Sequence, residues 1–395
     1  MTTLKTLFWI SLILIIYSYL GYAVLLFFLV SLKRAFGKKN NKSAVSAFEP
    51  EVTLIIAAYN EEDFIEEKIK NSLQINYPGS KLKLMVITDG SSDQTPSIVA
   101  RFEKVQLLHQ PERKGKVAAM NRAMNHVQTE IVISSDANTL LNPESVREIV
   151  KHYVDPRVGA VAGEKRILGT DRTHAAEIGE GIYWKYESFL KKMDSDLYSV
   201  VGAAGELFSF RRELFEETPE DVIIEDFVQS LRICLKGYVV RYEPGAYAME
   251  NSSVTMKEEE KRKIRISAGA FQAMIILKDL FNFIKYPILS FQFISHRILR
   301  WTLCPLGLLI LLLTNIILVI LGAGLIYTVA LILQLVFYSL SCLGWFWAAS
   351  NRIGKLLYIP YYFLFMNISV FMGFSRFIRK KQSVLWEKAS RKKMQ

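Results

Sequence analysis

Three long stretches without a charged residue constrain the fold of this chain more than any other feature of its sequence. They run from Thr6 to Leu32, from Trp301 to Asn351 and from Leu356 to Ser375. About 20 consecutive apolar residues suffice to cross a bilayer. The first stretch therefore predicts one membrane-spanning helix, and the second predicts two helices that turn near Gly322-Ala-Gly324.

The charges around these stretches predict an orientation. Five basic residues follow the first stretch: Lys33, Arg34, Lys38, Lys39 and Lys42. Because positive flanks of membrane helices stay in the cytosol, we expect the N-terminus outside and residues 50–300 in the cytosol of an integral plasma-membrane or inner-membrane protein. A cleaved signal peptide is the alternative, although the apolar core of a signal is shorter. The three cysteines show no paired spacing, so neither a disulfide framework nor a zinc site is predicted.

The third apolar stretch is less regular than the other two. It contains Pro360 and Gly373, and the tail from Arg376 onward has eight Lys or Arg against one Glu. We therefore expect an interfacial or re-entrant helix with a cytosolic tail, and a fourth span is the alternative. The predicted organisation is an anchor at 1–33, a basic linker at 34–49, a cytosolic domain at 50–269, amphipathic interfacial helices at 270–298, two spans at 299–348, the third apolar helix at 356–378 and a basic tail at 379–395.

Within the cytosolic region, two apolar, strand-like runs end in an acid. Residues 131–135 lead into Asp136 and Asn138, and residues 83–88 lead into Asp89. Alternation along an extended chain would put the side chains of Asp136 and Asn138 on one side. Two such oxygen ligands suit Mg²⁺ or Mn²⁺ that also binds water and a diphosphate. For either acid, a turn or helix cap is the alternative.

Strands and helices alternate through residues 50–136, which predicts a parallel sheet with right-handed crossovers. Tyr59, Asn60 and Glu61 follow the first strand, and Asn60 is the expected N-cap of the next helix. Lys116 opens a helix after a Gly-Lys turn; it is either a phosphate ligand or a solvated lysine. Ligands bind at the carboxyl ends of strands in such sheets, so these side chains are expected around one cleft. Neither a Rossmann fingerprint nor a P-loop motif is present, and the combination suits a nucleotide diphosphate.

The second half of the cytosolic region contributes three further motifs. Gly202-Ala-Ala-Gly205 precedes Glu206 and an apolar run, which suits either the close approach of a substrate or a tight turn. Glu225 and Asp226 open a helix; one acid suffices for the cap, which leaves the other as a general base. Arg265 lies in a basic helix and can bind a diphosphate or anionic lipid.

Taken together, these motifs resemble the inverting glycosyltransferases of family 2, in particular the membrane-embedded branch with hyaluronan, chitin, cellulose and poly-N-acetylglucosamine synthases. The resemblance implies an α/β fold of the GT-A type, a mixed sheet with helices on both faces, joined to transmembrane and interfacial helices. It implies catalysis by Asp226 with Glu225, and a Mg²⁺ or Mn²⁺ site at Asp136 and Asn138. We expect nucleotide-sugar binding by Ala57, Tyr59, Glu61, Asp89, Lys116, Asp136 and Arg265, and acceptor binding by Gly202, Gly205 and Glu206; the resemblance supports Tyr59, Glu61, Asp89, Asp136 and Arg265 among them. Trp386 to Arg391 is loosely similar to the family's gating segment.

The sequence departs from the family pattern at several positions. Asn138 replaces an Asp, Ile224 replaces a Thr, and Arg262 and Ile266 replace the Gln and the Trp of Gln-x-x-Arg-Trp. The last change removes an aromatic platform for an acceptor sugar. The predicted function is transfer of a UDP-hexose or UDP-N-acetylhexosamine sugar to a growing β-linked polysaccharide, with no nucleic-acid partner. The alternatives are transfer of one sugar to a lipid-linked acceptor, and a catalytically dead nucleotide-sugar-binding membrane protein.

Overall fold

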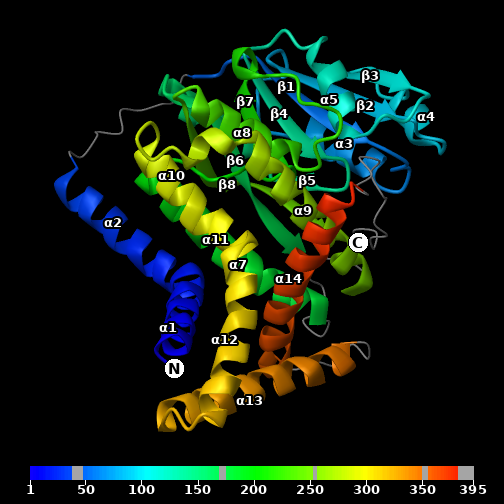
Figure 1. Ribbon diagram of the computed structural model, residues 1–395. Coiled ribbons are helices and arrows are strands. Elements are labelled where there is room, and N and C mark those ends of the chain that lie inside the picture. Colours follow the sequence, from blue (N-terminus) through cyan, green and yellow to red (C-terminus); the bar gives the residue numbers. More distant parts are fainter. Residues whose placement is uncertain (38–47, 169–174, 252–255, 349–354, 381–395) are drawn as a thin grey trace.

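The computed structural model describes residues 1–37, 48–168, 175–251, 256–348 and 355–380. A single sheet with packed helices lies at one end of the molecule, and long apolar helices extend from it (Figure 1). Strand order in the sheet is β3-β2-β1-β4-β7-β6-β8-β5. The strands are β1 Val52–Ala58, β2 Leu82–Asp89, β3 Val105–Gln110, β4 Ile131–Asp136, β5 Leu140–Leu141, β6 Val158–Leu168, β7 Leu207–Arg211 and β8 Val239–Asn251.

The first four strands pair in parallel, as the alternation of strands and helices predicts. Ala57 on β1 pairs with Asp136 on β4, so the ends of these two strands lie side by side. Strand β7 then runs antiparallel to β4 and to β6, which makes the sheet mixed. This reversal brings the loop before Leu207, which contains the two glycines, to the edge where β4 ends.

Both faces of the sheet are covered. Alternate residues of β1 point into two separate hydrophobic clusters, Ile55 into one and Leu54 into the other. The first cluster is closed by α5 and α8, and the second by α3, α4 and α6. The bounds of these helices are α3 Ile65–Leu73, α4 Thr95–Val99, α5 Lys116–Met124, α6 Ser145–Val150 and α8 Glu225–Leu235, with short 3-10 turns η2 Lys151–Val154 and η3 Arg212–Leu214.

One local prediction is wrong. Helix α3 begins at Ile65 after Phe64, so Asn60 is not its N-cap. Asn60 instead adopts a left-handed conformation, with φ of 53°, and its Oδ1 accepts a hydrogen bond from the backbone N–H of Ser92 at 2.8 Å. The side chain therefore joins the loop after β1 to the loop after β2, which a propensity argument on one loop does not reveal.

Four helices among the described residues are long and apolar enough to cross a membrane. The first is continuous from Thr2 to Phe36 and comprises α1 Thr2–Ile16, the π-helical η1 Tyr17–Gly21 and α2 Tyr22–Phe36. The others are α12 Leu303–Ile320, α13 Leu325–Ala348 and α14 Lys355–Ile378. Gly322 and Gly324 turn the chain between α12 and α13 with φ values of 66° and 128°, a conformation that glycine adopts readily.

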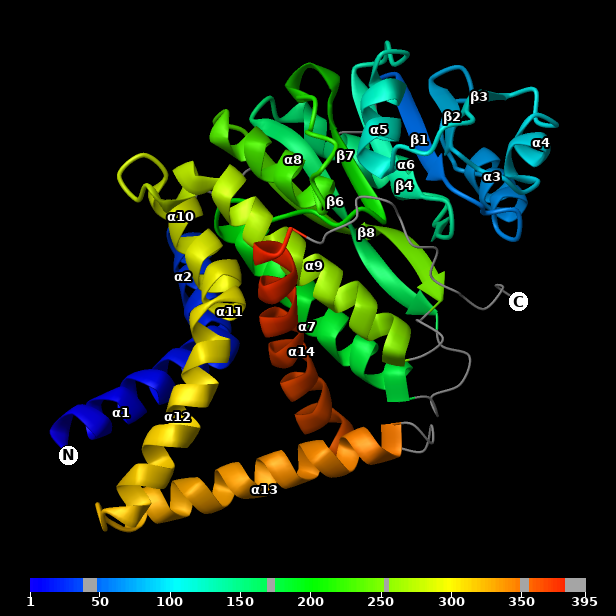
Figure 2. The same ribbon diagram turned by 45° about the vertical axis from the view of Figure 1, so that its right-hand side comes forward.

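The third apolar stretch forms α14 without interruption from Lys355 to Ile378, with Pro360 inside the helix. It lies along α9 (Met256–Ile276), as Figure 2 shows. Length and composition allow α14 to cross a membrane, and whether it spans or lies on the surface remains a prediction. The basic tail and its Trp386 to Arg391 segment lie outside the described residues, as does most of the basic linker.

Residues 270–298, predicted as interfacial helices, pack into the sheet domain. They form the end of α9, η4 Lys278–Phe281, α10 Pro287–Phe293 and the π-helical η5 Ile294–Ile298, followed by α11 Leu299–Trp301. Leu277, Leu289 and Phe293 belong to the same buried cluster as α5 and α8. Part of the apolar surface of this segment therefore covers the sheet domain, whereas Phe283 and Ile284 are exposed. The boundary predicted at residue 269 falls inside a continuous helix.

A buried polar network joins α7 (Ala175–Leu197) to the first apolar helix. Asp194 accepts hydrogen bonds from the hydroxyl of Tyr22 at 2.5 Å and from Nε2 of Gln292 at 3.0 Å. Glu187 pairs with Arg297 at 3.0 Å and with Arg300 at 2.9 Å. Nε of Arg297 donates to the carbonyl of Val201 at 3.1 Å, so this network also positions the glycine loop that follows.

Candidate active site

Lys116 is at the centre of the candidate site. Its ammonium nitrogen lies 2.9 Å from Oδ1 of Asp136 and 3.1 Å from Oε1 of Glu225. The carboxyls of Asp136, Glu225 and Asp226 together raise the pKa of Lys116 well above its usual value, although burial acts in the opposite direction. Residues from the ends of β4 and the starts of α5 and α8 thus meet around one cation.

Asp226 has the properties of a general base. It occupies the first turn of α8, after the N-cap residue Ile224. Burial and the neighbouring charge of Glu225 raise the pKa of Asp226 to about 7, although Lys116 lowers it. A base works best when its pKa lies near the working pH, so this carboxyl is suited to accept a proton from a hydroxyl.

Of the two glycines in the loop before β7, Gly205 is the one that lies beside Asp226. A Cβ on Gly205 would lie 2.8 Å from Nζ of Lys116 and 3.2 Å from Oδ2 of Asp226. Gly202 has a φ of 89° and lies against the ring of Phe227, where a Cβ would overlap the ring. Glu206 is paired with Lys165 at 2.7 Å. The structure thus places Gly205 at the site, whereas Gly202 packs behind it and Glu206 has an ionic partner.

The side chains predicted to bind the nucleoside lie near the ends of β1 and β2. Ala57 is buried inside β1, and Glu61 is buried in the loop beyond it. The guanidinium of Arg113 lies over the ring of Tyr59, 3.7 Å from its centroid. Asp89 accepts hydrogen bonds from the backbone N–H groups of Lys114 at 3.0 Å and Gly115 at 2.6 Å. Asp89 therefore holds the turn that presents Lys116.

Asp136 and Asn138 are related by a turn rather than by strand alternation. Strand β4 ends at Asp136, Ala137 and Asn138 form a turn, and Oγ1 of Thr139 donates to the Asp136 carbonyl at 2.9 Å. Both side chains remain partly exposed. Among the described residues no group of three or more His, Cys, Asp or Glu forms a metal site. The oxygen donors of Asp136 and Asn138 fit a hard cation that takes its other ligands from water and a diphosphate.

Helix α9 brings Arg265 to the same region. The carboxyls of Glu225, Asp226 and Asp136 act on its guanidinium, and burial lowers the pKa of Arg265. Arg262, one turn earlier, pairs with Glu259 at 2.8 Å. Arg265 is thus an arginine of the basic helix whose guanidinium interacts with all three clustered acids.

Sequence reasoning missed a buried lysine behind Asp136. Lys68 is fully buried on α3, and its ammonium donates to Oγ of Ser135 at 2.7 Å and to Oγ1 of Thr139 at 3.2 Å. These two residues flank the Asp136–Asn138 turn. Burial lowers the pKa of Lys68 to about 7. The sequence contained a signal for the burial of Lys68, because helical spacing places Lys68 on the same apolar face as Ile65 and Ile69.

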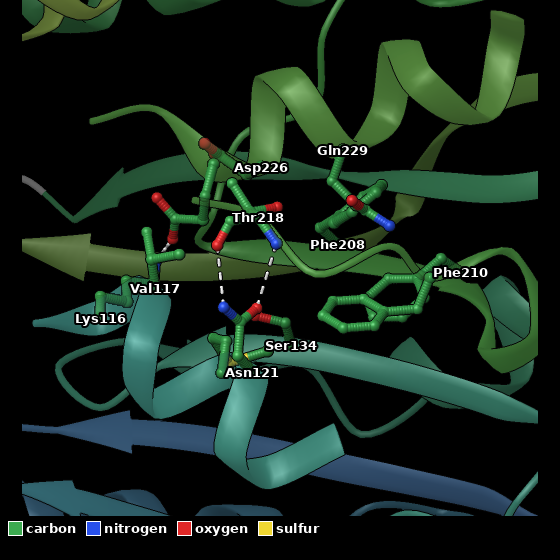
Figure 3. A pocket seen from close by; sticks show the side chains of 12 residues that line it. Lys116, Val117, Asn121, Ser134, Phe208, Phe210, Thr218, Asp226 and Gln229 are labelled. Atoms are coloured by element: carbon green, nitrogen blue, oxygen red, sulfur yellow. Dashed lines mark hydrogen bonds and ion pairs between the residues drawn. The ribbon is translucent and has the colours of Figure 1, made fainter. Parts of the chain in front are cut away.

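A pocket extends from the acids between α5, β7 and α8 (Figure 3). Lys116 and Asp226 lie on one side of it, and the rings of Phe208 and Phe210 lie on the other. Asn121 closes part of the rim, because its amide donates to the carbonyl of Thr218 at 2.8 Å. The pocket thus gives Asp226 a partly apolar surrounding, in agreement with its raised pKa.

Comparison with known proteins finds a matching family model and related sequences. Residues 53–218 match the model of glycosyl transferase family 2. Poly-β-1,6-N-acetyl-D-glucosamine synthase of Staphylococcus aureus strain MSSA476 is 26% identical over 276 residues, which are 66% of this chain and 65% of that protein. The enzyme of the same name from Staphylococcus epidermidis is 25% identical over 249 residues, or 60% of this chain and 58% of that protein. The chain thus spans about two thirds or less of the length of these curated relatives.

A solved structure shares the fold. A mannosyltransferase from Pyrobaculum calidifontis, in complex with GDP-Man and Mn²⁺, superposes with a TM-score of 0.70 at 24% identity, covering 95% of this chain and 100% of the other. The prediction of a GT-A mixed sheet with additional apolar helices is therefore confirmed. Residues 53–218 of this chain therefore form a glycosyl transferase family 2 domain, and the chain as a whole has a fold of the GT-A type.

Proposed function

We propose that this chain transfers a sugar from a nucleotide-diphosphate sugar to a growing β-linked polysaccharide at a membrane. The observation that carries the proposal is the convergence of Asp136, Glu225 and Asp226 on Lys116 at the carboxyl end of the sheet. The family match and the polysaccharide synthases among the relatives support it. Their name makes a UDP-N-acetylhexosamine the first donor to test, with a UDP-hexose as the second.

The donor is proposed to bind across the strand ends. Tyr59, Glu61 and Asp89 surround the nucleoside, with Arg113 over the Tyr59 ring. Lys116 and Arg265 supply positive charge to the diphosphate, since ammonium and guanidinium groups are strong donors to phosphate. A Mg²⁺ or Mn²⁺ ion held by Asp136 and Asn138 would add charge stabilisation to the leaving diphosphate. The Mn²⁺ complex of the structurally similar mannosyltransferase supports this choice of ion.

The proposed reaction is a single in-line displacement. Asp226 accepts the proton of an acceptor hydroxyl as that oxygen forms a bond to C1 of the donor sugar. The bond from C1 to the diphosphate oxygen breaks, and the nucleotide diphosphate leaves with the electron pair. Lys116 and Arg265 stabilise the negative charge that develops on it. One displacement inverts the anomeric centre, so an α-linked donor gives a β-linked product.

The membrane arrangement is proposed to place the catalytic domain in the cytosol. Lys33 and Arg34, at the end of the first apolar helix, contact the C-terminal end of α7: Nζ of Lys33 donates to the Leu197 carbonyl at 2.7 Å, and Arg34 pairs with Asp196 at 2.5 Å. Basic residues at this end favour the cytosolic side. The sheet domain lies at the same end (Figure 1), next to its proposed supply of nucleotide sugars.

A second candidate function is transfer of one sugar to a lipid-linked acceptor. It is favoured by Ile266, which replaces the aromatic residue expected to face an acceptor sugar. A binding protein without catalysis is a third possibility.

One experiment separates these functions. Purified protein in detergent is incubated with a panel of nucleotide sugars and Mn²⁺, and free nucleotide diphosphate and radiolabelled product are measured. We expect one class of donor to release nucleotide diphosphate and to give a polydisperse β-linked product. A single discrete lipid product would favour the second candidate. Donor binding without release, equal in wild type and Asp226→Asn, would reject the enzyme.

A further inference from the structure

Lys191 is a buried lysine without an ionic partner in the described part of the chain. Its residue is 5% exposed. Its ammonium has no carboxylate at ion-pair distance and no hydrogen-bond acceptor among the described residues; its contact is with the ring of Trp184, 5.4 Å from the centroid. Lys165, equally buried, pairs with Glu206 and Glu250 instead. An ammonium that contacts no acceptor in the described part of the chain keeps its N–H donors for a ligand, so the position of Lys191 points to one.

Trp184 and Lys191 share one face of α7, because they are two helical turns apart. The indole lies near both lysines, 5.1 Å from Nζ of Lys165 and 5.4 Å from Nζ of Lys191. Lys165 is joined to Glu206 at 2.7 Å. Glu206 follows Gly205, whose position is adjacent to Oδ2 of Asp226. The residues that connect Trp184 to the proposed base therefore lie on α7, on β6, in the loop before β7 and on α8.

The charges around Lys191 favour a neutral ligand. Burial and Arg297 lower the pKa of Lys191, whereas the carboxyls of Glu187, Glu206 and Asp226 raise it. An anionic ligand at this place would meet those carboxyls, and Lys165 is already neutralised by two glutamates. A sugar suits the surroundings better, because its apolar face can pack on an indole and its hydroxyls can accept hydrogen bonds from an ammonium.

Resting on the proposed glycosyl transfer, we propose that Trp184 and Lys191 form the subsite for the terminal sugar of the acceptor chain. The indole provides the aromatic face that Ile266 of α9 lacks. The Lys191 ammonium donates to acceptor hydroxyls and directs the nucleophilic hydroxyl to Asp226.

The test uses full-length protein in detergent, the donor found by the nucleotide-sugar screen, and a short β-1,6-linked N-acetylglucosamine oligosaccharide as the acceptor probe. The variants are Lys191→Met, Trp184→Ala and Trp184→Phe. Lys192→Met is the matched control, since Lys192 is the adjacent, exposed lysine of the same helix. We expect the acceptor KM to rise at least about tenfold in Lys191→Met and Trp184→Ala, the discrimination typical of one lost contact, and to stay near the wild-type value in Trp184→Phe and Lys192→Met. Donor KM and transfer to water should not change.

Other results would overturn the subsite. An unchanged acceptor KM in Lys191→Met would do so, as would equal KM values for Trp184→Ala and Trp184→Phe; the second comparison decides the matter if Lys191→Met does not fold. Wild-type transfer to polyprenyl phosphate but not to the oligosaccharide, abolished by Lys191→Met, would show an anionic acceptor instead. Failure of the wild type to release nucleotide from any donor would instead reject the proposed function itself, and the subsite with it.

Discussion

The ammonium of Lys116 lies 2.9 Å from Oδ1 of Asp136, a residue 20 positions further along the chain. The same nitrogen lies 3.1 Å from Glu225, which comes from the second half of the sheet domain. One lysine therefore holds together acids from β4 and α8, and its removal should affect both stability and catalysis.

Lys116→Met should destabilise the sheet domain by about 3 kcal/mol, because the loss of one partner leaves buried carboxylates uncompensated. The value is at the low end for such clusters, since the side chains of Lys116 and Asp136 keep 19% and 21% exposure. Thermal unfolding of the detergent-solubilised protein measures the effect. Mn²⁺ should restore more stability to this variant than to the wild type, because a divalent ion can replace the ammonium. Lys114→Met, at an exposed position of the same loop, is the control; an equal loss there would contradict the prediction.

The pH dependence of kcat/KM should reflect the ionisation of Asp226. Since burial and Glu225 raise its pKa to about 7, the base is protonated below that pH, and kcat/KM should rise as the pH increases towards and beyond 7. Asp226→Asn should lower kcat by about 10² to 10⁴-fold. Glu225→Gln should move the rising limb to lower pH, because it removes a charge that raises the pKa of Asp226. An unchanged midpoint in Glu225→Gln would argue against Asp226 as the titrating group.

The ionisation of Asp226 should also change the stability of the folded protein, and the two pKa values give the direction of this change. The folded-state pKa of Asp226, about 7, is above the unfolded value of about 3.9. Its contribution to stability is therefore full below pH of about 4 and is lost as the pH rises through about 7. Asp226→Asn should remove this decline, which melting curves between pH 5 and pH 8 would show as a flatter dependence than in the wild type.

Gly205→Ala should reduce kcat by about 10²-fold, the effect of displacing a catalytic group by about 1 Å. The added methyl would lie 2.8 Å from Nζ of Lys116 and would push it away from its carboxylate partners. The melting temperature should fall less than in Lys116→Met, because the displaced ammonium is retained and Gly205 does not have the positive φ that penalises alanine. Gly181→Ala is the control, since a Cβ at Gly181 meets no atom within 4 Å. Full activity of Gly205→Ala would show that the loop is more distant from the reaction than proposed.

Asn138→Asp should tighten Mn²⁺ binding about tenfold, because an added carboxylate increases the charge of an oxygen-ligand site. Electron paramagnetic resonance of free Mn²⁺ measures the affinity without any turnover. Removal of the ion with EDTA should then require a higher chelator concentration in the variant. Asn125→Asp, an exposed change at the end of α5, should leave the affinity unchanged. Equal affinities in all three proteins would place the ion elsewhere.

The local pattern of apolar and polar residues was sufficient to predict much of the sheet domain. Apolar runs ending in Asp89 and Asp136 correspond to β2 and β4, because strands buried on both faces require continuous apolar sequence. The acids at 225 and 226 open α8, as their favourable place near a helix N-terminus predicts. Lys116 and Asp136 were expected at one edge, because parallel strands end at the same edge.

The apolar helices, the parallel strands and the acids at their ends thus follow from the order of residues alone, since this order sets local burial and local polarity. Three other relationships became visible in the folded chain: β7 runs antiparallel beside β4, Arg113 lies over Tyr59, and Trp184 and Lys191 of α7 lie together in the field of Asp226. These contacts join residues whose separation in the sequence does not follow a helix or strand period. They depend instead on strand order and on how helices pack across the sheet. Packing between distant segments, and not local propensity, completes the site.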